Sequence, residues 1–480
     1  MSDTLTNPDL APTAPSQRTW TLWHIASLWV GMSVCIPSYM LAGAMIDAGI
    51  GWRASLAAVL LGNLIVLIPM LIHGHAGARY GIPFPVFARA AFGISGTHLP
   101  SMLRAVVACG WFGIQTWVGG LAMLALVRIA WPGIDGFGGD WRLMGHPLAE
   151  FLSFGVFWLM NLYFVWAGTE SIKWLETVSA PVLIGLCLAL VAWGASVAGG
   201  IDGMLGGAER LDARSTGRGT WLTLISWITA MVGYWATLSL NIPDFTRFAR
   251  SQRDQAIGQA LGLLTTMPFI ASVGVLVTGA TVVRYGQAVW NPVDLLERLT
   301  RESHNPVIGA AALVAILIAT LTTNIAANVV APANSIANLA PAKISFRIGG
   351  LIAGLVGILI VPWALLDRYQ AWLLTYSGLL GAVGGVLMCD YLVLRGGKLV
   401  AADLYARAGR YTYRGGVNHA AIWALGAGVA VAGLGLLVPA LRFLFDGAWF
   451  SAAIVSSLVY YLLMRRSPGR GSDAAQEAAA

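Results

Sequence analysis

Trp111 and Gln115 are the first pair of side chains whose types and spacing could recognise a ligand. They stand four residues apart in the run Gly110–Trp117 (GWFGIQTW), so on a helix both project from one face. An indole can stack on a flat heteroaromatic ring, and a glutamine amide can pair with the N–H and C=O groups at the edge of that ring. The same pair also suits plain packing, with Trp111 at a lipid interface or in a gap and Gln115 bonded to a neighbouring helix.

A ladder of hydroxyls, small residues and asparagines is the second candidate. It runs from Ala319 to Asn328 (ATLTTNIAAN). Hydroxyl oxygens are hard ligands of the kind that a small cation prefers. Small residues and threonine also mediate ordinary packing between membrane helices, and this alternative stays open.

Both candidates lie in stretches that lack Asp, Glu, Lys and Arg. Twelve stretches of at least 18 residues contain none of these four residue types: 19–46, 54–78, 105–127, 151–169, 177–201, 219–243, 255–283, 303–342, 348–366, 369–389, 415–441 and 447–464. A membrane-spanning helix needs about 20 apolar residues, and a charge at the bilayer centre costs roughly 2.5–3.5 kcal/mol. Each stretch therefore predicts one span.

The overall composition agrees with a polytopic membrane protein. The chain is 57% hydrophobic and 11% charged, whereas about one residue in four is charged in a soluble protein. The chain has four widely spaced cysteines and no CxxC pair, so neither a disulfide framework nor a zinc site is expected.

The basic residues predict the orientation of the chain. Twelve spans place both termini on one side, and a cytoplasmic N-terminus puts 18 of the 29 lysines and arginines inside. This bias follows the positive-inside rule and explains the net charge of +7 without a nucleic-acid partner. We expect a multi-pass protein of the plasma (inner) membrane with both termini in the cytoplasm.

Two predicted spans carry helix-breaking residues. They are Gly31–Tyr39 (GMSVCIPSY) in the first span and Gly233–Pro243 (GYWATLSLNIP) in the sixth. Proline removes a backbone donor and glycine loosens a helix, so free carbonyls and amides can face a cavity. Breaks in the first helix of each five-span half are typical of inverted-repeat transporters, whose sites lie at the breaks. Either break alone could also be a packing kink.

The lack of charged residues in the predicted spans helps to choose the coupling ion and to judge the alternative functions. Proton-coupled carriers often hold an ionisable group in the membrane, and no Asp or Glu lies in any of the twelve stretches, which favours sodium. A channel would need a pore-lining pattern, and an enzyme would need a nucleophile, a metal cluster or an acid–base pair. The spans lack carboxylates, and His73 and His75 are expected in a solvated loop, so we predict that the protein is not an enzyme. We also predict no cofactor beyond a co-transported cation.

Five sequence runs resemble the nucleobase:cation symporter-1 family of hydantoin, allantoin, uracil and cytosine permeases. Between Asn7 and Arg466 they are PDLAPTAPSQRTW, GHAGARYGIPFPVFARAAFG, GWFGIQTW, NIPDFTRFAR and TTNIAANVVAPANSIANLAP. The resemblance implies an all-α membrane protein with 12 transmembrane helices and alternating access. Its fold would be leucine-transporter-like, a 5+5 inverted repeat plus two C-terminal helices.

The same resemblance divides the chain into five segments. They are a cytoplasmic N-terminal segment 1–22, a first five-helix repeat 23–197, a second repeat 219–391, spans 11 and 12 in 415–464, and a tail 465–480. The low-complexity tail is expected to be disordered.

Residues of a substrate site also follow from the resemblance. Trp111 matches the family tryptophan that stacks on the substrate ring, and Gln115 matches the glutamine that bonds its edge. Asn328 matches the asparagine at the opposite edge, and Leu373 matches the leucine of a thin gate in span 10.

The span 6 residues and one departure complete the implied pocket. Trp235 matches the second stacking tryptophan, with the backbone of Gly233 and Tyr234 lining the pocket. At Cys35 the hydantoin permease has a glutamine and an allantoin permease an asparagine, and cysteine cannot offer the paired hydrogen bonds of an amide. Uracil or a similar oxo-pyrimidine is therefore the first expectation, with allantoin or hydantoin next. Cys35 could equally be a small buried hydrophobe.

The family sodium site maps onto five positions of this chain. Backbone carbonyls fall on Gly31, Val34 and Ala319, and hydroxyls fall on Thr322 and Thr323. The resemblance thus implies symport of a planar heterocycle with a cation, sodium first. A proton-coupled purine or cytosine permease of the same fold is the alternative.

Overall fold

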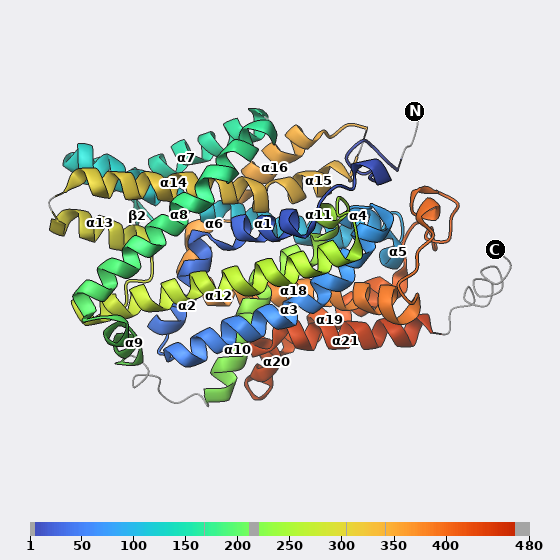
Figure 1. Ribbon diagram of the computed structural model, residues 1–480. Helices are drawn as coiled ribbons and strands as arrows, with labels where there is room; N and C mark the ends of the chain where they lie inside the picture. Colours follow the sequence, from blue (N-terminus) through green and yellow to red (C-terminus); the bar gives the residue numbers. More distant parts are fainter. Residues whose placement is uncertain (1–4, 168, 211–219, 304, 341, 466–480) are drawn as a thin grey trace.

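The computed structural model describes residues 5–465 except 168, 211–219, 304 and 341, and it is almost entirely helical (Figure 1). The long helices are α3 (Trp52–Tyr80), α6 (His98–Ala130), α7 (Leu148–Ala167), α8 (Thr169–Ala198), α10 (Thr220–Asn241), α12 (Gln252–Tyr285), α14 (Pro306–Asn328), α18 (Tyr369–Met388), α19 (His419–Leu437) and α21 (Ala448–Met464).

Shorter elements connect or extend these helices. The α-helices among them are α1 (Leu22–Ser33), α2 (Ile36–Asp47), α4 (Phe84–Phe87), α5 (Arg89–Phe92), α9 (Ile201–Arg210), α11 (Pro243–Thr246), α13 (Pro292–Ser303), α15 (Val330–Ala337), α16 (Phe346–Leu359), α17 (Pro362–Asp367) and α20 (Arg442–Asp446). The 3-10 and π turns are η1 (Pro15–Gln17), η2 (Pro132–Gly136), η4 (Cys389–Leu394), η5 (Ala401–Tyr405) and η6 (Pro439–Leu441). A small antiparallel hairpin joins β1 (Arg142–Leu143) to β2 (His146–Pro147).

The helices account for most of the predicted spans. Among the described residues, nine helices are long and apolar enough to cross a membrane, and two bent pairs, α1 with α2 and Pro439–Asp446 with α21, raise the number to eleven. The predicted span 348–366 differs, because α16 has only 14 residues and so is about 21 Å long, against about 30 Å of hydrocarbon. The exact number of twelve spans stays a prediction.

The predicted break in the first span is confirmed. Helix α1 ends at Ser33, α2 begins at Ile36, and their axes are bent by 56°. At the junction Cys35 is extended, with φ −145° and ψ 162°, and Pro37 lies in the first turn of α2. The chain therefore leaves the helical path where the sequence places proline.

The predicted break inside the sixth span is wrong. Helix α10 runs without interruption through Gly233 to Asn241, and only then does Pro243 begin α11. A Cβ on Gly233 would lie 2.8 Å from Ser377 Cβ and 2.9 Å from Leu373 O of α18. This glycine is needed for close contact between two helices, and the proline acts at the helix end, where it is tolerated.

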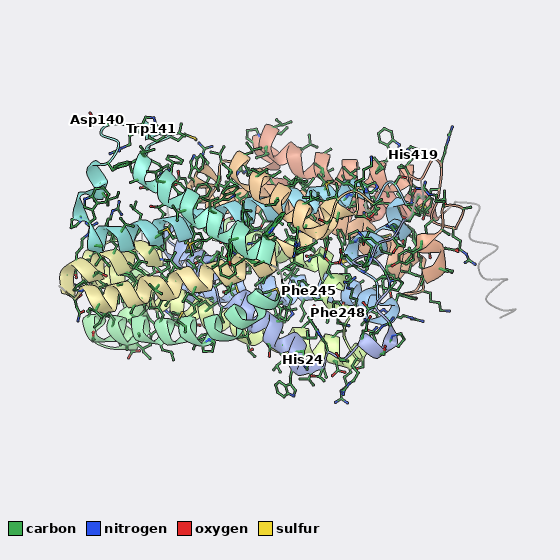
Figure 2. The ribbon with its side chains drawn as sticks, turned by 90° about the horizontal axis from the view of Figure 1, so that it is seen from above. His24, Asp140, Trp141, Phe245, Phe248 and His419 are labelled. Atoms are coloured by element: carbon green, nitrogen blue, oxygen red, sulfur yellow. The ribbon has the colours of Figure 1, made fainter. Side chains whose placement is uncertain are left out.

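Distant segments of the chain pack side by side in the bundle. Helix α1 packs against α12, α6 against α14 and α7, and α10 against α3 and α18, while the C-terminal helices α19 and α21 pack together and against α18 (Figure 1). The loop residues Asp140 and Trp141 and the α19 residue His419 lie toward opposite ends of the molecule (Figure 2). The segment before α1 and the end of α21 lie toward the same end of the molecule (Figure 1).

The N-terminal segment is fastened to that same end by backbone bonds. Thr13 N–H donates to Gly81 O at 2.8 Å, and Trp20 N–H donates to Phe248 O at 2.9 Å. Gly81 closes α3 with a left-handed φ of 69°, which favours glycine. The segment thereby sets where α1 enters the bundle.

His73 is buried, so its predicted place in a solvated loop is wrong. It lies within α3 with no exposed surface, and its Nδ1 is 2.6 Å from Ser239 O of α10. The predicted loop is in fact part of α3, which continues to Tyr80.

Candidate functional site

Trp111 lies in the centre of a buried aromatic cluster. Its indole is 4% exposed and meets Tyr234, Tyr369 and Tyr376 edge-on, with ring centroids 5.0, 6.0 and 6.5 Å away. Its Nε1–H donates to Tyr376 OH at 3.1 Å. These partners come from α10 and α18, so Trp111 does not sit at a lipid interface.

Trp235 belongs to the same cluster from the α10 side. It is 3% exposed and makes edge contacts with Tyr234 at 4.8 Å and with Trp29 at 5.1 Å. Its Nε1–H has no hydrogen-bond partner among the described residues. Tyr234 therefore contacts both of the tryptophans that the sequence predicts to stack on a ligand.

Gln115 lies one turn from Trp111 on α6 and is almost completely buried. Within the part of the chain that the structure describes, its Oε1 has no hydrogen-bond partner. A buried acceptor left unpaired costs about 1–3 kcal/mol. This oxygen is therefore available to accept a hydrogen bond from a ligand N–H group.

Asn328 is held in orientation by a network of buried amides. Its Nδ2 donates to Asn324 Oδ1 at 3.0 Å. The Nδ2 of Asn324 in turn lies 3.2 Å from Phe112 O, 3.0 Å from Thr116 Oγ1 and 3.1 Å from Asn161 Oδ1. This bond uses one of the two N–H donors of Asn328, so its other N–H and its Oδ1 can both turn to a ligand.

Asn324, Thr116 and Asn161 were not predicted as site residues. Asn324 has a sequence signal, because it stands four residues before Asn328 and so shares its helical face. Asn161 comes from α7, far away in the sequence, and its contact with α14 has no local signal.

Cys35 and Tyr234 meet at the break of the first span, together with Ser38. The three side chains lie 2.9 to 3.3 Å from one another. Nearby, Tyr369 OH donates to Pro37 O at 3.1 Å, which ties α18 to the start of α2. The structure thus brings Cys35 next to the aromatic cluster. Ser38 was not predicted as a site residue, and its only signal in the sequence is that it stands three residues after Cys35.

The predicted cation ligands on α14 are all buried. Ala319, Thr322 and Thr323 are 2%, 1% and 6% exposed. The hydroxyl of Thr322 lies 2.9 Å from Ala319 O and 3.0 Å from Ile318 O, to which it donates. A hydroxyl that donates in this way keeps lone pairs that could face a cation.

The end of α1 supplies carbonyls that the helix does not use. Cys35 N–H bonds to Ser33 O at 2.9 Å and not to Gly31 O, and Val34 ends the helix with ψ 79°. The final carbonyls of a helix lack intrahelical partners. Helix α1 contacts α14, so these carbonyls and the two threonines lie on neighbouring helices.

Any cation held here would meet neutral oxygens. Among the described residues, no group of three or more His, Cys, Asp or Glu side chains could hold a metal ion. Carbonyl and hydroxyl oxygens suit a hard monovalent or divalent cation better than a transition metal.

Leu373 is fully buried in α18, and its carbonyl faces the close approach to Gly233. The position therefore links α18 to α10 beside the aromatic cluster. Its assignment as a gate stays a prediction.

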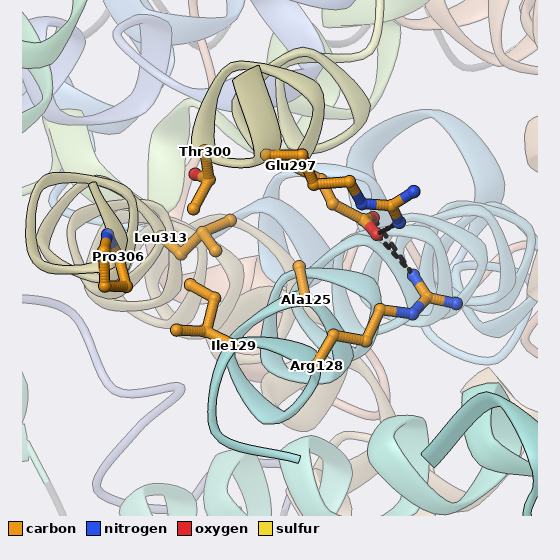
Figure 3. A pocket seen from close by; sticks show the side chains of 8 residues that line it. Ala125, Arg128, Ile129, Glu297, Thr300, Pro306 and Leu313 are labelled. Atoms are coloured by element: carbon orange, nitrogen blue, oxygen red, sulfur yellow. Dashed lines mark hydrogen bonds and ion pairs between the residues drawn. The ribbon is translucent and has the colours of Figure 1, made fainter. Parts of the chain in front are cut away.

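A separate cavity of about 270 Å³ lies between α6, α13 and α14 (Figure 3). Its lining residues are Ala125, Arg128, Ile129, Glu297, Thr300, Arg301, Pro306 and Leu313. Arg128 and Arg301 both pair with Glu297 there. Ala125 is ten residues beyond Gln115 on α6, or about 15 Å, and none of the predicted site residues lines this cavity.

A bundle of apolar helices with a first span broken beside a buried aromatic cluster is typical of secondary transporters. The chain belongs to the nucleobase:cation symporter-1 family, because the family model described as "permease for cytosine/purines, uracil, thiamine, allantoin" matches residues 12–455. This confirms the resemblance drawn from the five sequence runs.

Individual relatives support the same assignment. The purine-uracil permease NCS1 of Arabidopsis thaliana is 41% identical over 96% of this chain and 78% of its own length. The allantoin permease of Bacillus subtilis (strain 168) is 38% identical over 97% of this chain and 94% of its own length.

A solved structure has the same fold. It shows Mhp1, a nucleobase-cation-symport-1 family transporter, in a closed conformation with bromovinylhydantoin bound. It has a TM-score of 0.76 and 26% identity and covers 96% of each chain. The predicted all-α, leucine-transporter-like fold is confirmed, and the chain is a multi-pass permease and not an enzyme.

Proposed function

We propose that this chain imports a planar nucleobase or related heterocycle by alternating access, coupled to a cation. Uracil or another oxo-pyrimidine is the first choice, and allantoin or hydantoin follow. The observation that carries the proposal is the buried indole of Trp111 near the Oε1 of Gln115, which has no hydrogen-bond partner among the residues that the structure describes. The relatives support it, since those compared are named for purine and uracil or for allantoin, and Mhp1 holds a hydantoin.

In this proposal each candidate residue has one role. Trp111 and Trp235 stack on the two faces of the ring, and the side-chain oxygens of Gln115 and Asn328 accept its N–H groups. Gly233, Tyr234 and Cys35 line the pocket, and Leu373 acts as a gate.

Sodium is the proposed coupling ion, held by the carbonyls of Gly31, Val34 and Ala319 and the hydroxyls of Thr322 and Thr323. Proton coupling is the second candidate because of Asp244. It lies one residue beyond the sixth charge-free stretch, is 8% exposed, and accepts Phe84 N–H at 2.7 Å. Burial raises the pKa of its carboxyl group, and the Phe84 N–H and the charges of Arg104 and Arg247 oppose that shift.

We also propose the plasma membrane as the location, with both termini in the cytoplasm. The support is the excess of lysine and arginine predicted on that side. The segments 23–197 and 219–391 would be the two inverted five-helix repeats, which together make a bundle and a hash motif.

Uptake of labelled uracil by cells expressing the protein tests the function directly. Unlabelled uracil, hypoxanthine, allantoin and hydantoin are added as competitors, with sodium present or replaced by potassium. We expect uracil to compete most strongly. Failure of all four to compete, with the protein in the membrane, would contradict the proposal.

Methylated analogues should compete poorly, because Gln115 and Asn328 would lose the N–H groups that they accept. An unpaired buried acceptor costs about 1–3 kcal/mol, or about 5- to 150-fold in affinity. Competition by 1-methyluracil and 3-methyluracil against labelled uracil measures this. If both compete as well as uracil itself, hydrogen bonding is not how the ring is recognised.

Asn324→Ala should weaken uracil binding by about 2- to 10-fold, because Asn328 loses the hydrogen bond that orients it. Asn63→Ala is the matched control: Asn63 is also fully buried, but it donates within its own helix to Val59 O at 2.7 Å. Equilibrium binding to the two purified variants gives the comparison. Equal affinities would show that Asn324 does not position Asn328.

A further inference from the structure

Cys35, Ser38 and Tyr234 form a closed triangle of polar side chains. Cys35 Sγ lies 3.2 Å from Ser38 Oγ and 3.3 Å from Tyr234 OH, and the two hydroxyl oxygens are 2.9 Å apart. All three residues are at least nine-tenths buried, at 2%, 0% and 7% exposed. We name these three side chains the triad.

The number of protons determines what the triad can offer to a fourth group. A thiol and two hydroxyls carry one proton each. Three mutual contacts use all three protons when each group donates once and accepts once. The oxygens and the sulfur keep lone pairs, so toward a ligand the closed triad can accept a hydrogen bond but cannot donate one.

The triad lies at the proposed substrate site. The ring of Tyr234 contacts both Trp111 and Trp235, with centroids 5.0 and 4.8 Å away. Cys35 is the extended residue at the break of the first span, and Ser38 lies in the first turn of α2. The triad thus joins the break to the aromatic cluster.

We propose that the triad is a specificity element that selects ligands presenting an N–H group at this edge over ligands presenting an oxygen. The proposal rests on the proposed function and adds the chemistry of one side of the pocket. A ligand oxygen here would face only lone pairs. A ligand N–H would find an acceptor without disturbing the three internal contacts.

Isosteric ligand pairs test the proposal, because exchanging N–H for O reverses the hydrogen bond without adding bulk. The pairs are uracil with 3-oxauracil and hydantoin with oxazolidine-2,4-dione. Equilibrium binding to the purified full-length protein gives an affinity ratio for each pair. In at least one pair we expect the N–H ligand to bind about 5- to 150-fold more tightly.

Three variants each remove one group of the triad and leave one of the remaining two protons without a partner inside it. They are Tyr234→Phe, Ser38→Ala and Cys35→Ala. The remaining two groups share one contact and can donate to a ligand oxygen, so the ratio should fall toward one in each variant. Cys35→Ser restores a third proton and should keep the wild-type ratio.

Matched controls make the same chemical changes outside the triad. Tyr405→Phe removes a partly buried hydroxyl that bonds to Leu10 O, and Ser239→Ala removes one that bonds within α10 to Ala236 O. Both should keep the wild-type ratio.

Unchanged ratios in all three triad variants would overturn the proposal, as would equal loss of both ligands of a pair, which indicates a structural role. Wild-type protein that binds neither uracil nor hydantoin would contradict the proposed function itself, and the triad proposal would fall with it.

Discussion

Trp111→Ala is expected to lower the affinity for uracil by about 5- to 150-fold, because stacking of a base on an aromatic ring contributes roughly 1–3 kcal/mol. The ring is buried among tyrosines of α10 and α18, so no other side chain can take its place without rearranging the cluster. Equilibrium binding of labelled uracil to the purified protein measures the loss.

Two further variants separate loss of stacking from loss of fold. Trp111→Phe retains an aromatic face and should bind with intermediate affinity. Trp423→Ala removes a tryptophan of α19 that is 72% exposed and should bind uracil as the unmodified protein does. Unchanged affinity in the Trp111→Ala protein, with a normal melting temperature, would remove Trp111 from the site.

Replacing Thr322 and Thr323 together by alanine should raise the sodium concentration needed for half-maximal uracil binding by about tenfold or more. Each hydrogen-bonding group lost from a charged partner costs about 1.5–3 kcal/mol. At saturating sodium the uracil affinity should approach the original value, because the aromatic cluster is unchanged.

The matched control is the adjacent pair Thr265 and Thr266 on α12. Their hydroxyls donate to carbonyls of their own helix, Leu261 O and Gly262 O, and neither belongs to the proposed site. Their double alanine variant should keep the original sodium dependence. A normal sodium dependence in the Thr322/Thr323 variant would place the cation elsewhere.

Features set by local chemistry were predictable from the sequence. The first-span break follows from Pro37, and the shared face of Trp111 and Gln115 follows from their spacing of four. The sixth span shows the limit of this approach, because a glycine can mark either a break or a close helix contact. Only the neighbouring helix, α18, shows that Gly233 serves the contact.

Long-range contacts had no signal in the sequence. Ser38 and Tyr234 are 196 positions apart, and Asn161 and Asn324 are 163 apart. Composition and periodicity describe one helix at a time, so they predict which residues share a face but not which faces meet. The burial of Asp244 had no signal in the sequence either, because its contact with Phe84 is long-range. Asp244 also stands just outside a charge-free stretch, where a charged residue is expected.

Uptake of labelled uracil into proteoliposomes, with a sodium gradient and a pH gradient imposed separately, tests the central claim most directly. One positive charge moving inward gains about 2.3 kcal/mol per 100 mV, which supports roughly 40-fold accumulation before the sodium gradient is added. We predict that the sodium gradient drives accumulation, that the pH gradient alone does not, and that Trp111→Ala abolishes it. Accumulation driven by the pH gradient and indifferent to sodium would contradict the sodium assignment and favour Asp244 as the coupling group.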